Sequence, residues 1–219
     1  HQGRSATVLA VNTDDLIAEA QRSAGIVEFV PRVGDFIATD EPLFRLYGNG
    51  PFDEIKLQGA VALGPERTME QDPMFAFRIL LDIALKALSK AINDPTTATL
   101  AIDQLHRLLR CVGNRKLSGE TIRDRNGQLR VIFRTPDWED YVRLTFTELR
   151  FNGAESIQVV RRLRAMIEDL IKTLPEHRHP ALHKELALLD LAVQKVYLLP
   201  EDLALARIPD SQGLGGSAR

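Results

Sequence analysis

The sequence predicts an α+β protein that is mainly α-helical, with a small N-terminal β-rich module followed by a helical bundle that one β-hairpin interrupts. Three observations predict this fold class. Short segments rich in small and β-branched residues, separated by Gly and Pro, fill residues 1–63. Long apolar segments with helical periodicity fill residues 64–208. Among them lies Asn126-Gly127, the strongest short signal for a hairpin turn.

The N-terminal module is expected to combine short strands with one helix. Asn12 or Thr13 can cap the helix, because a side-chain oxygen at that position accepts hydrogen bonds from free backbone N–H groups. Gly and Pro in the segments 31–35 and 40–42 are typical of turns. The expected elements are strands at 5–11, 25–30, 43–47 and 55–63 and a helix at 14–22.

The domain at 64–208 is expected to be helical. Two of its helices begin at Asp-Pro pairs, Asp72-Pro73 and Asp94-Pro95, because Asp is a good N-cap and Pro at the first helical position gives up no useful hydrogen bond. We expect helices at about 73–91, 95–112, 136–151, 156–174 and 181–199, a hairpin near 119–134, and a disordered tail at 209–219.

Composition limits the class of protein. The 219 residues are 44% hydrophobic, which is enough for a sizeable core. A formal net charge of -2 gives no indication of nucleic acid as a partner. Cys111 is the single cysteine, so an internal disulfide is excluded, and we read it as a small core residue. No apolar run approaches the roughly 18 to 20 residues that span a bilayer. Because a strand is expected only a few residues from the start, we expect a soluble piece of a longer protein.

Residues 64–98 carry the densest polar pattern. Most of the helix expected at 73–91 is apolar, so we expect it to be mostly buried. One narrow stripe is polar, and its members are three or four residues apart, where side chains on a helix meet. The stripe consists of Arg78, Asp82, Lys86, Ser89 and Asn93.

The segments GPERTMEQDP and DIALKALSKAINDPTTA closely resemble the signature of a bacterial family of membrane proteins, the domain of unknown function numbered 2254. That signature has an R-T-x-x-Q-D stretch, a helix reading V-D-I-A-x-R-A-L-S, and an A-I-N-D-P-x-T-A close. Lys86 stands where a basic residue is usual, and Leu81 is a conservative departure. The opening AVNTDDL is similar to the segment after the family's last membrane helix. The resemblance covers most of the chain and implies a soluble C-terminal half behind several transmembrane helices, without supplying an activity.

Seven polar residues of this motif are candidates for a ligand site: Arg67, Gln71, Asp72, Arg78, Asp82, Asn93 and Asp94. The N-termini of two helices offer free N–H groups and partial positive charge, which favour an anion or a small polar ligand. Alternatively, the aspartates at the helix starts are ordinary caps, and Asp82 pairs with its helix neighbours on a solvated stripe. A site would require Asp82 to be partly screened from water, with Arg67 and Asn93 near it.

Two further clusters are weaker candidates. Imidazoles at the spacing H-x-H-x3-H can bind zinc, although surface histidines are the better explanation of His177, His179 and His183. A local basic patch could meet lipid head groups, although the solvated face of an amphipathic helix explains it as well. That patch consists of Arg161, Arg162 and Arg164, with Arg150 nearby.

The leading hypothesis is a soluble, non-enzymatic domain of a membrane protein that serves assembly, regulation or ligand sensing for the membrane part. No cofactor is expected, because no phosphate-binding glycine loop, serine-nucleophile elbow or metalloprotease helix is present. The alternative is an enzyme or ligand-binding domain that uses Arg67, Asp82, Asn93 and Asp94. Expected partners are the protein's own N-terminal transmembrane region and further copies in a homo-oligomer, with no nucleic acid. We expect this domain on the cytoplasmic side of the inner membrane.

Overall fold

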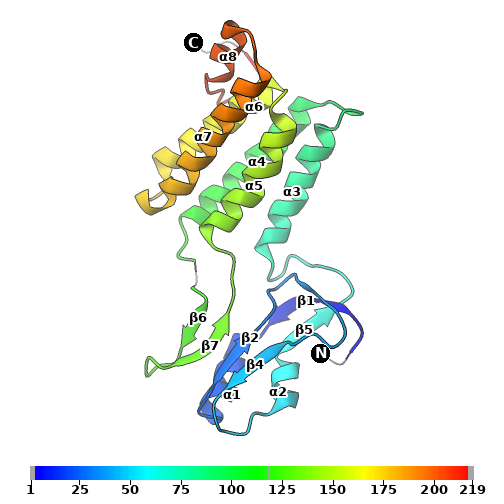
Figure 1. The fold of residues 1–219 in the computed structure, drawn as a ribbon, viewed down its shortest axis with the longest axis vertical. Coiled ribbons are helices and arrows are strands. Elements are labelled where there is room, and N and C mark those ends of the chain that lie inside the picture. Colours follow the sequence, from blue (N-terminus) through cyan, green and yellow to red (C-terminus); the bar gives the residue numbers. More distant parts are fainter. Residues whose placement is uncertain (1–2, 118, 217–219) are drawn as a thin grey trace. The chain divides into compact units, whose positions relative to one another are not determined.

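The computed structural model describes residues 3–117 and 119–216, which form two compact units. The first unit holds the described residues up to Ala76 together with those from 119 to 136, and the second unit holds the others. The predicted fold class, α+β and mainly α, is confirmed. Of the described elements, every strand lies in the first unit, and the second unit is helical (Figure 1).

Two small sheets and two helices build the first unit. One sheet has the order β3-β1-β5 and is antiparallel throughout; the other has the order β4-β2-β7-β6, in which only β2 and β7 are parallel. Their shared core includes Leu16, Val27, Phe29 and Val131, all with 0% exposure. The elements are β1 (Ala6–Val11), α1 (Thr13–Arg22), β2 (Ile26–Phe29), β3 (Phe36–Ile37), β4 (Phe44–Tyr47), α2 (Glu54–Gly59), β5 (Val61–Gly64), β6 (Thr121–Arg123) and β7 (Leu129–Phe133).

The expected strand at 55–63 is wrong in its first half. Asp53 accepts a hydrogen bond from the Lys56 backbone N–H at 3.2 Å and thereby caps α2. Only the end of the segment, β5, is a strand, and it pairs with β1. The cap that Asp53 provides therefore favours a helix where the apolar pattern of the segment suggested a strand.

The hairpin at 119–134 belongs to the first unit, whereas we expected it within the helical domain. β7 pairs in parallel with β2, with Val131 opposite Val27, so the hairpin completes the second sheet. A parallel pairing over about one hundred residues leaves no local signal in the sequence. The lead-in to the motif, residues 64–76, also lies in the first unit, so the boundary expected at residue 63 is displaced.

The second unit is built around α6. This helix is buried on nearly all sides, and α4, α5, α7 and α8 contact it (Figure 1). Among the described residues, none of the helices is long and apolar enough to cross a membrane. The elements are α3 (Pro73–Ala87, which begins in the first unit), α4 (Pro95–Gly113), α5 (Trp138–Gly153), α6 (Ile157–Thr173), the 3-10 turn η1 (Glu176–Arg178), α7 (His179–Val196) and α8 (Pro200–Ala206).

Helix α3 is shorter and more exposed than expected. It ends at Ala87 instead of residue 91, and the turn that follows contains Asn93 in a left-handed conformation with φ of +48°. One face buries Phe77, Leu81 and Ala84, but Ile79 and Ile83 on another face are 36% and 45% exposed. The helix therefore has more apolar side chains than the described chain buries.

The segment 209–216, which we expected to be disordered, is ordered by hydrogen bonds; residues 217–219 lie outside the described part. The Asp210 carboxylate accepts backbone N–H groups from Gln212, Gly213 and Gly215 at 2.7 to 3.0 Å. Its own backbone N–H donates to the Arg161 carbonyl at 3.1 Å. The glycines allow the tight turns that this ring of hydrogen bonds requires, since Gly213 and Gly215 have positive φ.

Candidate functional site

Arg67 and Asp72 form an ion pair at the start of α3 within the first unit. The Asp72 carboxylate, only 3% exposed, accepts a hydrogen bond from the Arg67 guanidinium and another from the Phe75 backbone N–H at 3.2 Å. The Arg67 guanidinium also lies over the Phe75 ring, 5.5 Å from its centroid. Asp72 therefore acts as an N-cap whose charge Arg67 balances.

This ion pair packs against the turn that joins β2 to β3. Gly34 has φ of +90°, and a Cβ atom there would collide with both the Asp72 carboxylate and the Arg67 guanidinium. Gln71 holds the same segment to β1, because its side-chain carbonyl accepts the Val11 backbone N–H at 3.1 Å. Arg67, Gln71 and Asp72 thus fasten residues 67–75 to the first unit.

Arg78 and Asp82 form the second group, on α3. Arg78 lies 2.5 Å from Asp82 and 2.5 Å from Glu148 of α5, and these hydrogen bonds, that of Glu148 most, raise the pKa of Arg78. The Asp82 side chain is 55% exposed, which is the exposure of a solvated helix pair. Arg78 joins α3 to α5 through Glu148, whereas Asp82 contributes little to that connection.

Asn93 and Asp94 form the third group, in the turn between α3 and α4. Asn93 has a left-handed conformation in this turn, six residues after the end of α3, and its backbone N–H donates to the Ser89 carbonyl at 2.8 Å. Asn tolerates this conformation better than most residues with a side chain. Asp94 caps α4 by accepting the Thr97 backbone N–H at 3.0 Å, and its hydrogen bonds to Thr97 lower the pKa of Asp94.

The seven candidates therefore fall into three groups, each satisfied within its own unit. Arg67 already pairs with Asp72, and Asp82 already pairs with Arg78. Because Arg67 and Asp82 belong to different units, their predicted proximity stays a prediction. Every group has a structural explanation in capping, ion pairing or backbone conformation.

The arginines of α6 have a role that sequence reasoning missed. Instead of forming an exposed basic patch, Arg161, Arg162 and Arg164 are 1%, 6% and 6% exposed. Arg161 donates to the carbonyls of Ile208 and Gly216 at 3.0 and 2.7 Å, and so holds the segment 208–216 against α6. Their partners are far away in the sequence, so the amphipathic pattern of α6 alone could not reveal their burial.

Arg162 organises a polar network between α6 and α4. Its Nε donates to Asp103 at 2.6 Å, and its Nη2 lies 3.0 Å from His106 Nδ1. Since a guanidinium can only donate, Nδ1 accepts, and Nε2 donates to Asp169 at 2.9 Å. This arrangement requires neutral imidazole, and burial, followed by the Arg162 charge, lowers the pKa of His106.

Arg164 and Arg150 make the corresponding contacts with α7. Arg164 pairs with Asp190, and Arg150 Nε lies 3.6 Å from Glu185 Oε2. Glu185 is only 7% exposed, and burial raises the pKa of its carboxyl. All four arginines of the expected basic patch therefore face acidic or carbonyl groups of their own unit.

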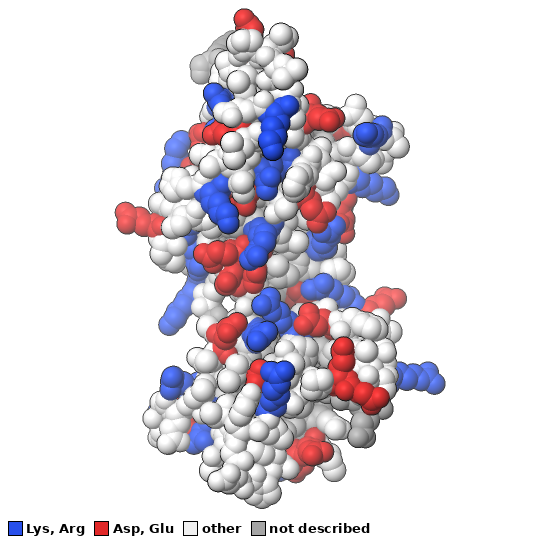
Figure 2. All heavy atoms as spheres, viewed as in Figure 1, with Lys and Arg blue, Asp and Glu red and all other residues white. Residues whose placement is uncertain are grey.

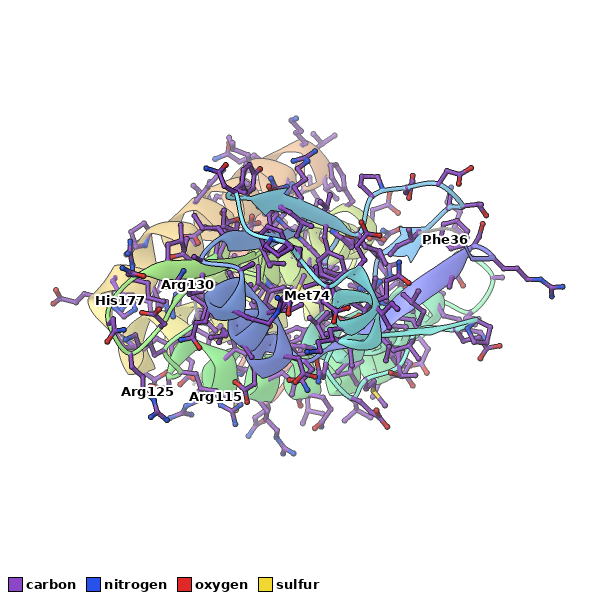
Figure 3. All side chains as sticks on the ribbon, turned by 90° about the horizontal axis from the view of Figure 1, so that it is seen from below. Phe36, Met74, Arg115, Arg125, Arg130 and His177 are labelled. Carbon is purple, nitrogen blue, oxygen red and sulfur yellow. The ribbon has the colours of Figure 1, made fainter. Side chains whose placement is uncertain are left out.

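The histidine cluster does not form a metal centre in the described residues, where no group of three or more His, Cys, Asp and Glu side chains is placed to hold an ion. His179 Nε2 lies 2.9 Å from the Leu174 carbonyl, and the His183 ring packs edge-on at a centroid distance of 6.1 Å. His177, labelled in Figure 3, is exposed. Cys111, expected in the core, is exposed on α4.

Charges of both signs alternate over the face shown in Figure 2, so that face presents no extended patch of one sign among the described residues. In the first unit, a cavity of about 400 Å³ lies beside the turn at Asp35. Its two carboxylates hold backbone: Asp35 accepts from Arg32 N–H at 2.8 Å, and Glu41 from Ala38 N–H at 3.0 Å. Neither feature provides an evident catalytic arrangement.

The fold and the motif together define an α+β domain in which the motif's polar residues serve as caps, in ion pairs and in the turn between α3 and α4. The family described as predicted membrane protein, DUF2254, matches residues 1–169, and the chain belongs to this family. The chain is similar to the uncharacterized proteins Mb1321c of Mycobacterium bovis and Rv1290c of Mycobacterium tuberculosis, with 28% identity to each over 228 residues. These matches cover 100% of this chain but only 42% of each relative. No solved structure matches the chain.

Proposed function

We propose that this chain is a non-enzymatic extramembrane domain that serves assembly or regulation of the membrane part of its protein. One observation carries the proposal: the motif segment exposes apolar side chains while its polar side chains are engaged. Ile79, Ile83, Ile92 and Leu100 are 36%, 45%, 50% and 60% exposed. Full burial of an entirely exposed Ile or Leu contributes roughly 1.5 to 3 kcal/mol, so each of these partly exposed side chains can contribute about half of that to docking.

The enzyme alternative gains no support from the geometry. Asp94 is occupied as the cap of α4, and Asp82 faces water beside Arg78. A carboxylate that serves as a general acid or base is usually buried or lies beside a like charge, whereas the Asp82 side chain is 55% exposed beside Arg78 and Asp94 accepts hydrogen bonds from Thr97. The membrane family is established by the match above, and the cytoplasmic side of the inner membrane remains our proposal for this domain.

The test is recovery of the chain with membranes from cells that also contain the full-length protein. The unaltered chain should be recovered, and Ile79→Ser/Ile83→Ser should reduce recovery, whereas Ile55→Ser, at an 83% exposed position of α2, should not. Equal recovery of all three would refute docking through the motif.

Two further measurements separate the alternatives. If the enzyme alternative is wrong, Asp82→Asn and Asp94→Asn should leave a cellular phenotype of the full-length protein intact. Loss of that phenotype by folded variants would instead support acid-base chemistry. A reporter fused after Arg219 that is active only in the periplasm would exclude the cytoplasmic side.

A further inference from the structure

One face of α3 combines apolar and charged side chains in a self-complementary order. Ile79, Asp82, Ile83 and Lys86 have the spacing i, i+3, i+4 and i+7, so they share one side of the helix. All four are exposed, while Phe77, Leu81 and Ala84 pack on other sides. We call these four residues the α3 face.

The α3 face differs from ordinary scattered exposure. Single exposed apolar side chains are normal on protein surfaces. Here two isoleucines lie one turn apart, with an acidic and a basic residue beside them on the same side. Asp82 pairs only with Arg78 of its own helix, and Lys86 has no ion-pair partner among the residues that the structure describes.

We propose that the α3 face is the contact surface of a symmetric homodimer, in which the α3 helices of two copies pack antiparallel. A twofold axis perpendicular to the helix, midway between Asp82 and Lys86, places each Asp82 opposite the Lys86 of the other copy. The contact is then isologous, and its two ion pairs are formed at once. A parallel arrangement in register would instead oppose like charges.

The same axis also determines what happens to the isoleucines. Ile83 lies one residue from the axis level, so the two copies of Ile83 are offset along the helix by only about 3 Å, at 1.5 Å per residue. The two copies of Ile83 therefore contact each other near the axis, whereas each Ile79 lies farther out, at the level of Ser89 of the other copy. This deepens the proposed assembly function, and rests on it, by naming the partner as a second copy of the chain.

The dimer should be weak for the isolated chain. Helix α3 has 15 residues and is about 22 Å long, so the contact is smaller than the roughly 800 Å² per partner of a standard interface. Tethering two copies in one membrane raises their effective concentration and would strengthen the contact without new interactions. Dimerisation should therefore depend on concentration in solution.

Disulfide trapping provides the first test. In a Cys111→Ser background, Ile83→Cys should give an intermolecular disulfide under mild oxidation, because two copies of residue 83 meet near the axis. The matched control is Ile55→Cys in the same background, which is more exposed at 83% but lies on α2. At least a tenfold excess of dimer for Ile83→Cys is expected, and equal yields would overturn the proposal.

Charge reversal provides the second test, read by analytical ultracentrifugation over a range of concentrations. Asp82→Lys and Lys86→Asp should each weaken dimerisation at least tenfold, because each opposes like charges across the axis. The double variant Asp82→Lys/Lys86→Asp should restore it, with circular dichroism checking that every variant is folded. Restoration is specific to a self-contact, so failure of the double variant to dimerise would overturn the proposal.

The outcomes also separate this inference from the proposed function. If both dimer tests fail but Ile79→Ser/Ile83→Ser still reduces recovery with membranes, the α3 face binds the membrane part and the second copy is the wrong partner. If the isoleucine variant changes neither dimerisation nor recovery, the docking function and the homodimer are both refuted.

Discussion

Asp72→Ala should destabilise the domain much more than Asp82→Ala, although both remove a motif carboxylate. Asp72 is 3% exposed and accepts hydrogen bonds from Arg67 and from the Phe75 backbone N–H. Loss of the helix cap costs about 1 kcal/mol. Loss of the charged hydrogen bond from Arg67, whose side chain is 39% exposed, costs about 1 kcal/mol after discounting for solvent screening.

The expected total for Asp72→Ala is therefore about 2 kcal/mol, which lowers the Tm of a chain of this size by about 4 to 8 °C. The Asp82 side chain is 55% exposed and pairs within its own helix, so Asp82→Ala should cost about 0.3 to 0.5 kcal/mol. Urea unfolding measures both values. Asp72→Asn keeps an acceptor for the cap but loses the charge, and should cost about half as much as Asp72→Ala.

A loss of 2 kcal/mol or more for Asp82→Ala would refute this reasoning. It would mean that Asp82 is screened from water by a group that its own helix does not supply. The ligand-site hypothesis for Arg67, Asp82 and Asn93 would then be favoured over a solvated helix pair.

Three further predictions follow from the described contacts. Gly34→Ala should lower the free energy of unfolding, measured in urea, by about 1 to 3 kcal/mol, because a side chain at φ of +90° is strained and collides with the Arg67–Asp72 pair. The control Gly59→Ala has open space at its Cβ and should be neutral or stabilising. Arg161→Met should release the segment 208–216, so that limited proteolysis followed by mass spectrometry shows faster cleavage after Arg207; unchanged cleavage would show that the Asp210 ring suffices. The folded state lowers the pKa of His106, so the contribution of neutral His106 to stability is present above the ordinary pKa of about 6.5 and is lost as the pH falls below that value. The urea midpoint should therefore decrease from pH 7 to pH 5, and it should decrease less in His106→Gln.

Local signals in the sequence located much of the fold. Asn126-Gly127 marks the hairpin turn, where Gly127 has φ of +77°, and Asp94 with Pro95 marks the start of α4. The helix expected at 156–174 is found as Ile157–Thr173. In each case the residues that determine the structure are neighbours in the chain, so capping and turn chemistry suffice.

Long-range partners were the part that the sequence could not show. The pairing of β7 with β2 depends on backbone groups about one hundred residues apart, and it moves the hairpin into the first unit. Arg161 is buried because carbonyls near the C-terminus accept its hydrogen bonds. The sequence pattern of an amphipathic helix is the same whether its charged side chains are solvated or hydrogen-bonded to distant acceptors, so the pattern cannot predict their burial.

The residues of the motif can likewise serve either the fold or a binding function, and a local pattern does not distinguish the two. The structure narrows the binding function to the α3 face. Asp72, Arg78 and Asn93 each perform a task that an isolated domain needs, namely a helix cap, an ion pair between helices and a left-handed residue in the turn before α4. Ile79 and Ile83 perform no such task within the described chain, where both are exposed. Substitutions of the polar group should therefore impair folding first, whereas substitutions of the two isoleucines should leave folding intact and impair docking. A motif that served only the fold would show the first effect without the second.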